Sequence, residues 1–111
     1  MGVELHDAFA AELRALARDD RREAAAIEQA LLVLAAEGPG LGFPWTSAVR
    51  GSPGLRELRP RGGRSSHRAL FRRRGDHAVV LALAPEAVSN RRGFRRAVEH
   101  AERRISEMGY T

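Results

Sequence analysis

Residues 78–84 are all apolar, at odd and even positions alike. Consecutive side chains of a β-strand point to opposite faces of the sheet, so a strand with this pattern must be covered on both faces. A turn sequence, Arg-Gly-Asp, ends two residues before the stretch, and Pro85 follows it. We therefore predict a central strand over His77–Ala84, with other parts of the chain packed against both of its sides.

Two shorter stretches before this strand also have a strand-like composition, Leu55–Arg59 and His67–Arg72. A glycine-containing turn separates them at residues 61–64, so the three stretches together predict an antiparallel meander. Val3–His6 alternates between apolar and polar residues and predicts a short first strand, followed by Asp7 as the N-cap of a helix.

Apolar residues recur at helical spacing between the first strand and the meander. One segment runs to about Arg18 and a second over Arg21–Glu37, which predicts a helical hairpin. Asp20 and Glu23 have the spacing of a capping box at the start of the second helix. Gly38-Pro39-Gly40 supplies the stop at its end.

A last helix is predicted after the central strand, with Ser89 or Asn90 as its cap. Its buried stripe has a spacing of three and four residues and consists of Phe94, Val98, Ala101, Ile105 and Met108. The predicted order is therefore β-α-α-β-β-β-α. This is an α+β fold with a small antiparallel sheet, an N-terminal helical hairpin and a C-terminal helix, and we expect one domain over residues 1–111.

Composition excludes several classes of function. The chain has no cysteine, which excludes disulfides, cysteine-ligated metal centres and thiol catalysis. His6, His77 and His100 have neither metal-ligand spacing nor acidic companions, so we expect no metal site and no cofactor. No run of 18 apolar residues and no secretory leader pattern occurs, which predicts a cytoplasmic protein without a membrane span.

Charge is distributed very unevenly along the chain. Residues 1–49 carry a net charge of −4 and residues 50–111 a net charge of +9, with arginine as the only basic residue apart from histidine. Between Arg50 and Arg74 there are nine arginines and a single acid, Glu57. Such a density favours a polyanion as partner over a merely solvated basic face. The candidate RNA-binding residues are Arg50, Arg56, Arg61, Arg64, His67, Arg72 and Arg73.

Several short strings follow one another in a familiar order. They are Glu37-Gly38-Pro39-Gly40-Leu41-Gly42-Phe43-Pro44, Val49-Arg50-Gly51-Ser52, Glu57-Leu58-Arg59-Pro60, His67-Arg68-Ala69-Leu70-Phe71 and the helix from Phe94 to Arg104. With them the chain resembles the RelE/ParE toxin superfamily, and within it the phage Gp49-like, HigB-type toxins, over nearly its whole length. The resemblance implies a RelE-like fold and the toxin of a type II toxin–antitoxin pair. Many members are ribosome-dependent, metal-independent endoribonucleases that cut mRNA, whereas ParE-like relatives inhibit DNA gyrase.

The resemblance also implies a catalytic site. Glu57 stands where members carry a suspected base, Arg68 matches the arginine of a Tyr-Arg-x-x-Tyr-like string, and Arg91 or Arg92 approximates a late basic residue of the family. Cleavage through the 2′-hydroxyl needs a base, cations for the charge that develops at phosphorus, and an acid for the leaving oxygen. Side-chain alternation places Glu57 and Arg59 on one strand face, and Arg68 on the next strand can reach it.

Each assignment has a structural alternative. Glu57 can serve as the counter-ion of its arginine neighbours, and Arg59 and Arg68 can be structural strand residues. His67 is expected on the opposite strand face from Arg68, where it is a surface or partner-contact residue before it is a general acid. Trp45 can stack on a base, but after Pro44 it fits a packing role better.

The chain departs from the HigB-type pattern after its central strand. Relatives often have Gly-Asp-Lys and then an aromatic hydroxyl, whereas this chain has neither there, and its only tyrosine is Tyr110. We therefore keep two alternatives beside the ribosome-dependent nuclease: a ParE-like gyrase-inhibiting toxin and an inactive basic nucleic-acid-binding protein. The expected partners of the nuclease are the ribosome, mRNA and a helix-turn-helix antitoxin.

Overall fold

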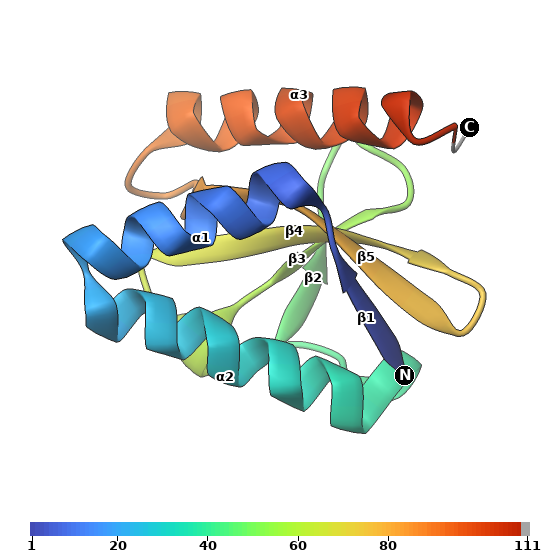
Figure 1. Cartoon of the computed structure of the whole chain (residues 1–111), viewed down its shortest axis with the longest axis horizontal. Helices are drawn as coiled ribbons and strands as arrows, with labels where there is room; N and C mark the ends of the chain where they lie inside the picture. The colour runs from blue at the N-terminus through green and yellow to red at the C-terminus, as the bar shows by residue number, and fades with distance from the viewer. Residues whose placement is uncertain (110–111) are drawn as a thin grey trace.

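The computed structural model describes residues 1–109 and consists of a five-stranded sheet with helices on both faces (Figure 1). Three of the elements are helices: α1 (Asp7–Asp19), α2 (Arg21–Glu37) and α3 (Arg91–Glu107). Two short 3-10 turns are η1 (Gly38–Gly40) and η2 (Pro60–Gly63). The strands are β1 (Gly2–Leu5), β2 (Thr46–Ala48), β3 (Leu55–Leu58), β4 (His67–Arg74) and β5 (His77–Pro85).

The strands lie in the order β1-β5-β4-β3-β2. The predicted antiparallel meander is confirmed as β3, β4 and β5, and β1 adds to β5 in parallel. The sheet has one strand more than predicted, because β2 pairs antiparallel with the outer side of β3, with Ser47 opposite Glu57. A three-residue strand is too short to show an alternating pattern, so sequence periodicity could not reveal it.

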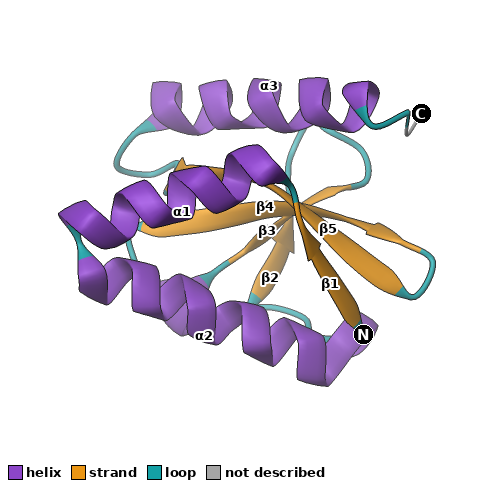
Figure 2. Ribbon diagram, viewed as in Figure 1, coloured by secondary structure: helices purple, strands orange, loops and turns teal. Residues whose placement is uncertain are grey.

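Helices cover both faces of β5, which confirms the prediction made from its apolar residues (Figure 2). The α1–α2 hairpin packs on one face, where Phe9 and Ile27 meet Val80, and α3 packs on the other, where Ala101 meets Leu81. An irregularity in the pairing of β4 with β5 falls between Leu70 and Phe71. Both sides of the sheet are therefore buried, as an α+β fold of this order requires.

The helix caps agree with the sequence at two of three places. Asp20 accepts a hydrogen bond from the Glu23 amide at 3.2 Å, and Asn90 accepts one from the Gly93 amide at 2.8 Å. The prediction for the first helix was wrong, because its N-cap is His6 and Asp7 is already helical. His6 Nδ1 accepts a hydrogen bond from the Ala8 amide at 3.0 Å. The imidazole nitrogen thereby satisfies one of the backbone N–H groups that have no partner within the first turn of a helix.

Beyond the end of β1, the outer edge of β5 is closed by side chains. Arg104 Nη1 donates to the carbonyl of Leu81 at 2.6 Å, and Glu12 accepts a hydrogen bond from the Leu83 amide at 3.0 Å. Arg104 and Glu12 also pair with each other at 2.9 Å, which joins α3 to α1 across the strand. Within residues 1–109, no helix has the length and apolar character needed to cross a membrane.

Candidate active site

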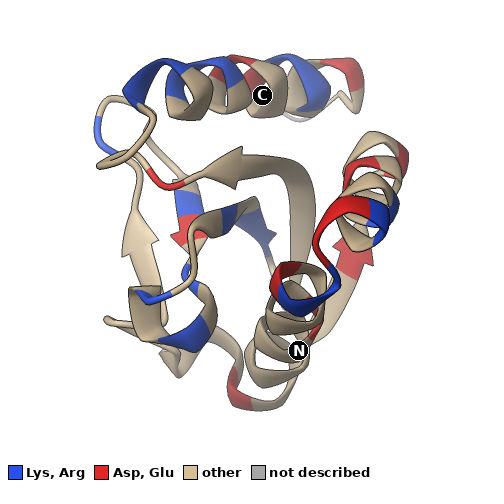
Figure 3. Cartoon of the chain, turned by 90° about the vertical axis from the view of Figure 1, so that its left-hand side faces the viewer, with Lys and Arg blue, Asp and Glu red and all other residues tan. Residues whose placement is uncertain are grey.

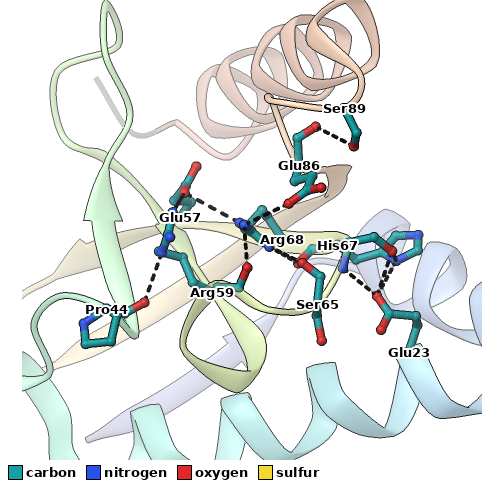
Figure 4. Close-up of polar contacts among 11 residues, drawn as sticks. Glu23, Pro44, Glu57, Arg59, Ser65, His67, Arg68, Glu86 and Ser89 are labelled. Atoms are coloured by element: carbon teal, nitrogen blue, oxygen red, sulfur yellow. Dashed lines mark hydrogen bonds and ion pairs between the residues drawn. The ribbon is translucent and has the colours of Figure 1, made fainter.

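Glu57 lies between two arginines on the face of the sheet that α3 covers (Figure 4). It is on β3 and shares its face with Leu55, whereas Arg68 on β4 shares its face with Leu70; both leucines pack in the core under α3. Arg59 Nη1 lies 2.9 Å and Arg68 Nε 3.6 Å from Glu57 Oε1. The structure thus brings together these three side chains, as side-chain alternation predicted.

Arg68 is buried, with only 4% of its surface exposed. Its Nη1 donates to the carbonyls of Ser65 at 2.6 Å and His67 at 3.0 Å, and its Nη2 donates to the carbonyl of Gly63 at 3.2 Å and to Glu86 at 3.4 Å. Burial, and then the charge of Arg59, lower the pKa of the Arg68 guanidinium. Each terminal nitrogen has two N–H donors and makes two contacts, so this arginine is committed to the protein.

Arg59 is the more accessible of the two cations, with 21% of its side chain exposed. Its Nε donates to the carbonyl of Pro44 at 2.9 Å, and its guanidinium carbon lies 5.2 Å from the ring centre of Phe43. Gly63 packs against it so closely that a Cβ there would lie 2.5 Å from Arg59 Nη2, and its φ of +98° also requires glycine. Arg59 is therefore held in place from several sides while its head group stays near solvent.

His67 lies on the opposite face of β4 from Arg68, as predicted, and contacts α2. Its Nδ1 is 2.8 Å from Glu23 Oε1, which also accepts hydrogen bonds from the amide and hydroxyl of Ser66, both at 3.0 Å. Burial alone would raise the pKa of Glu23, but the hydrogen bonds from His67 and Ser66 outweigh it and lower the pKa. The sequence indicated Glu23 only as a helix-capping residue, so this link between α2 and β4 was missed.

Arg91 and Arg92 are the first two residues of α3. With neighbouring residues of the same helix they line a shallow cavity of about 340 Å³. In the part of the chain that the structure describes, no hydrogen bond or ion pair joins either of them to Glu57, Arg59 or Arg68. The late residue that does reach Arg68 is Glu86, just after β5, which the sequence analysis did not single out. Tyr110 lies outside the described residues.

Basic residues occur on helices, strands and loops of the chain (Figure 3). Arg56 donates to the Thr46 hydroxyl at 2.9 Å and lines a cavity with Phe71 and Arg73 on the side of the α1–α2 hairpin. Arg56 and Arg73 also line a second cavity, together with Arg72 and Gly54. The remaining arginines of the predicted RNA-binding set lie elsewhere, Arg61 and Arg64 at or beside η2 and Arg50 in the turn after β2.

No group of three histidine, cysteine, aspartate or glutamate side chains that could hold a metal ion occurs among residues 1–109. The candidate site consists of the Glu57 carboxylate, the accessible guanidinium of Arg59 and the buried guanidinium of Arg68, which also contacts Glu86. A carboxylate beside an accessible guanidinium is suited to accepting a proton and holding an anion.

The fold is similar to that of several solved structures. It is similar to the YoeB/ParE toxin from Agrobacterium tumefaciens, with 19% identity and a TM-score of 0.58 over 78% of this chain and 99% of that chain. It is also similar to the YoeB dimer from Staphylococcus aureus, with 12% identity and a TM-score of 0.55 over 72% and 90% of the two chains. The heterotetrameric YoeB–YefM toxin–antitoxin complex from Staphylococcus aureus gives 12% identity and a TM-score of 0.54, with the same coverage.

These likenesses confirm the α+β fold that the resemblance to the RelE/ParE superfamily implied. No curated protein matches the sequence. The family model described as "Phage derived protein Gp49-like (DUF891)" matches residues 11–106, and the chain therefore belongs to the Gp49-like family.

Proposed function

We propose that this protein is the toxin of a type II toxin–antitoxin pair and that it cleaves mRNA on the ribosome with Glu57 and Arg59. The toxin part of the proposal is supported by the Gp49-like family and by the fold shared with YoeB and ParE proteins. The observation that carries the nuclease part is the Glu57 carboxylate, 13% exposed and held by guanidinium groups from two neighbouring parts of the sheet.

The proposed chemistry uses the two oxygens of Glu57 differently. Both guanidinium contacts are made to Oε1, which leaves Oε2 as the oxygen that takes the proton of the ribose 2′-hydroxyl. The 2′-oxygen then attacks phosphorus, the bond to the 5′-oxygen breaks, and the products are a 2′,3′-cyclic phosphate and a 5′-hydroxyl that takes its proton from solvent. Arg59 stabilises the charge that develops on the phosphoryl oxygens.

Arg68 has a different part in this proposal. Because it is buried and its terminal nitrogens are engaged by protein acceptors, it positions Glu57 and does not touch the substrate. Removing it would leave Glu86 without its ion pair and Glu57 with Arg59 alone, and would damage the fold. Substitution of Glu57 is therefore the cleaner test of catalysis.

The partners follow from charge and from the complex of a structural neighbour. The basic second half of the chain, at +9, is complementary both to RNA and to an acidic peptide segment. A YoeB toxin is known in complex with its antitoxin YefM, so we include a small antitoxin, with a helix-turn-helix domain, as the partner that neutralises this protein.

The test compares Glu57→Gln with Arg103→Ala. The side chain of Arg103 is 57% exposed on α3 and pairs with Glu107 at 3.8 Å. Induced in bacteria, the wild-type protein should stop protein synthesis before DNA synthesis and leave cut mRNA that primer extension detects. Loss of the base should lower the cleavage rate of the purified, folded protein on programmed ribosomes by about 100-fold or more. Arg103→Ala should cleave at the wild-type rate.

Two results would contradict the proposal. Equal cleavage by Glu57→Gln and wild type would remove Glu57 from the mechanism. Arrest of DNA synthesis before protein synthesis, without cut mRNA, would favour the gyrase-inhibiting alternative.

A further inference from the structure

We propose that Phe43 is a stacking platform for one unpaired base of single-stranded RNA next to Glu57 and Arg59. The inference rests on the proposed function, because it assigns a base-binding position to the same site. Phe43 is 77% exposed, whereas Phe9 and Phe71 are fully buried in the core. A single exposed aromatic ring needs no explanation by itself, so the argument depends on what holds it and what lies beside it.

The ring is connected to the candidate site through a single side chain. The Arg59 guanidinium carbon lies 5.2 Å from the ring centre of Phe43, in the range of a cation–π contact. The same guanidinium donates to Glu57 and to the carbonyl of Pro44. The aromatic ring, the guanidinium and the carboxylate therefore lie next to one another in space. An RNA strand has a base for the ring, a phosphate for the guanidinium and a 2′-hydroxyl for the carboxylate.

The loop that carries Phe43 is anchored on both sides. The Thr46 hydroxyl donates to the carbonyl of Leu41 at 2.6 Å, and the Trp45 amide donates to the carbonyl of Gly42 at 3.0 Å. The Arg59 amide also donates to the carbonyl of Trp45 at 2.8 Å, which ties the loop to the end of β3. A base that stacks on this ring meets a platform that is already ordered, so little conformational entropy is lost on binding.

Trp45, the aromatic residue that the sequence analysis considered for stacking, is placed differently. It is half-buried and lines an apolar cavity of about 400 Å³ with Ala25, Ala26 and Ala30 of α2. Trp45 thus lies against α2, and the packing role that the sequence favoured for it stays a prediction. Phe43, two residues earlier, is the more exposed of the two aromatic side chains.

A nucleobase fits this position better than an apolar peptide side chain, because the charged group that packs on the ring is the guanidinium of Arg59. Stacking of a base on an exposed aromatic residue contributes roughly 1–3 kcal/mol, and a neighbouring guanidinium adds an ion pair with phosphate. An apolar side chain would use only the ring.

The experiment uses a short unstructured RNA with 2′-O-methyl sugars and one 2-aminopurine, which binds without being cleaved. Titration with the wild-type protein should quench the fluorescence of the 2-aminopurine, because stacking on an aromatic ring quenches it. Phe43→Ala and Phe43→Leu should bind about 5- to 100-fold more weakly and lose the quenching. Phe43→Trp should keep both. The matched control is Leu32→Ala, which removes another exposed apolar side chain, 67% exposed on α2, and should bind like wild type.

The outcomes separate this inference from the proposed function. Wild-type affinity and quenching in Phe43→Ala would overturn the platform even if the protein cleaves mRNA. Absence of RNA binding, with loss of antitoxin binding in Phe43→Ala, would overturn it in favour of a protein contact. Quenching that depends on Phe43, in a protein whose Glu57→Gln variant is as toxic as wild type, would support the platform while contradicting the cleavage mechanism.

Discussion

Two arginines with little exposure, Arg68 on β4 and Arg104 on α3, are used in different ways. Arg68 belongs to the Glu57 cluster, has 5% of its side chain exposed, and contacts three backbone carbonyls and two carboxylates. Arg104 closes the edge of β5, has 11% of its side chain exposed, and contacts one carbonyl and one carboxylate. Both are paired, as buried charges must be.

The two arrangements differ in how many oxygens of the carboxylate contact a guanidinium group. Arg104 and Glu12 form a two-pronged pair, with Nη1 to Oε1 at 3.1 Å and Nη2 to Oε2 at 2.9 Å, so both oxygens of Glu12 are used. Around Arg68, Glu57 receives both of its guanidinium contacts on Oε1. The first arrangement closes the edge of β5, whereas the second leaves Oε2 of Glu57 for the proton transfer that we propose.

The largest expected effect is that of Arg68→Met. Removing the guanidinium leaves Glu57 and Glu86 without their shared cation and leaves the carbonyls of Ser65 and Gly63 without a donor, so the free energy of unfolding should fall by about 3–5 kcal/mol. Arg68→Lys should recover little, because one ammonium cannot reach acceptors on so many sides. Urea unfolding at pH 7 measures the free energy of unfolding of both variants. A decrease below about 1 kcal/mol for Arg68→Met would show that the contacts of Arg68 contribute little to the stability of the fold.

A smaller effect is expected for Arg104→Met, about 2–3 kcal/mol in the free energy of unfolding, because one carbonyl and one partly exposed carboxylate lose their partner. Cleavage by the folded variant should stay at the wild-type rate, since Arg104 is far along the chain from the proposed site and contacts neither Glu57 nor Arg59. A double-mutant cycle with Glu12→Gln gives the pair energy. A reduced cleavage rate in the folded Arg104→Met variant would contradict the purely structural role that we assign to Arg104.

The smallest effect is that of Glu23→Gln, which removes the charge that Ser66 and His67 contact next to Arg68. At pH 7 the variant should be about 1 kcal/mol less stable, because hydrogen bonds to a charged group are stronger than those to a neutral one. The pKa of Glu23 is lowered on folding, so its contribution is complete above the usual value of 4.5 and is lost as the pH falls through the lower folded-state value.

Urea titrations of wild type and Glu23→Gln across that range should therefore converge at acid pH. Glu28→Gln, at an exposed position on the same helix, is the matched control and should show no such convergence. A difference between wild type and Glu23→Gln that stays constant from pH 7 to acid would show that the carboxylate is not stabilised by these contacts.

Much of the fold could be predicted because its rules act over a few residues. The apolar positions of β5 required cover on both faces, and Asp20 and Asn90 had the right neighbours to cap their helices. Alternation along β3 was enough to put Glu57 and Arg59 on one side, where the structure shows them in contact. The predicted cap of the first helix was wrong because the side chains of His6 and Asp7 both offer hydrogen-bond acceptors, and the local sequence did not indicate which of them caps the helix.

The same local rules predicted only part of the candidate site, because contacts between residues far apart in the sequence depend on how helices and loops pack. Glu23 meets Ser66 and His67 across 43 and 44 residues, Glu86 meets Arg68 across 18, and Arg104 meets Glu12 across 92. Periodicity gives the face on which a side chain lies, but it gives neither the neighbour across the sheet nor the depth of burial. Tertiary packing alone buried Arg68 among acceptors on several sides and left Phe43 exposed.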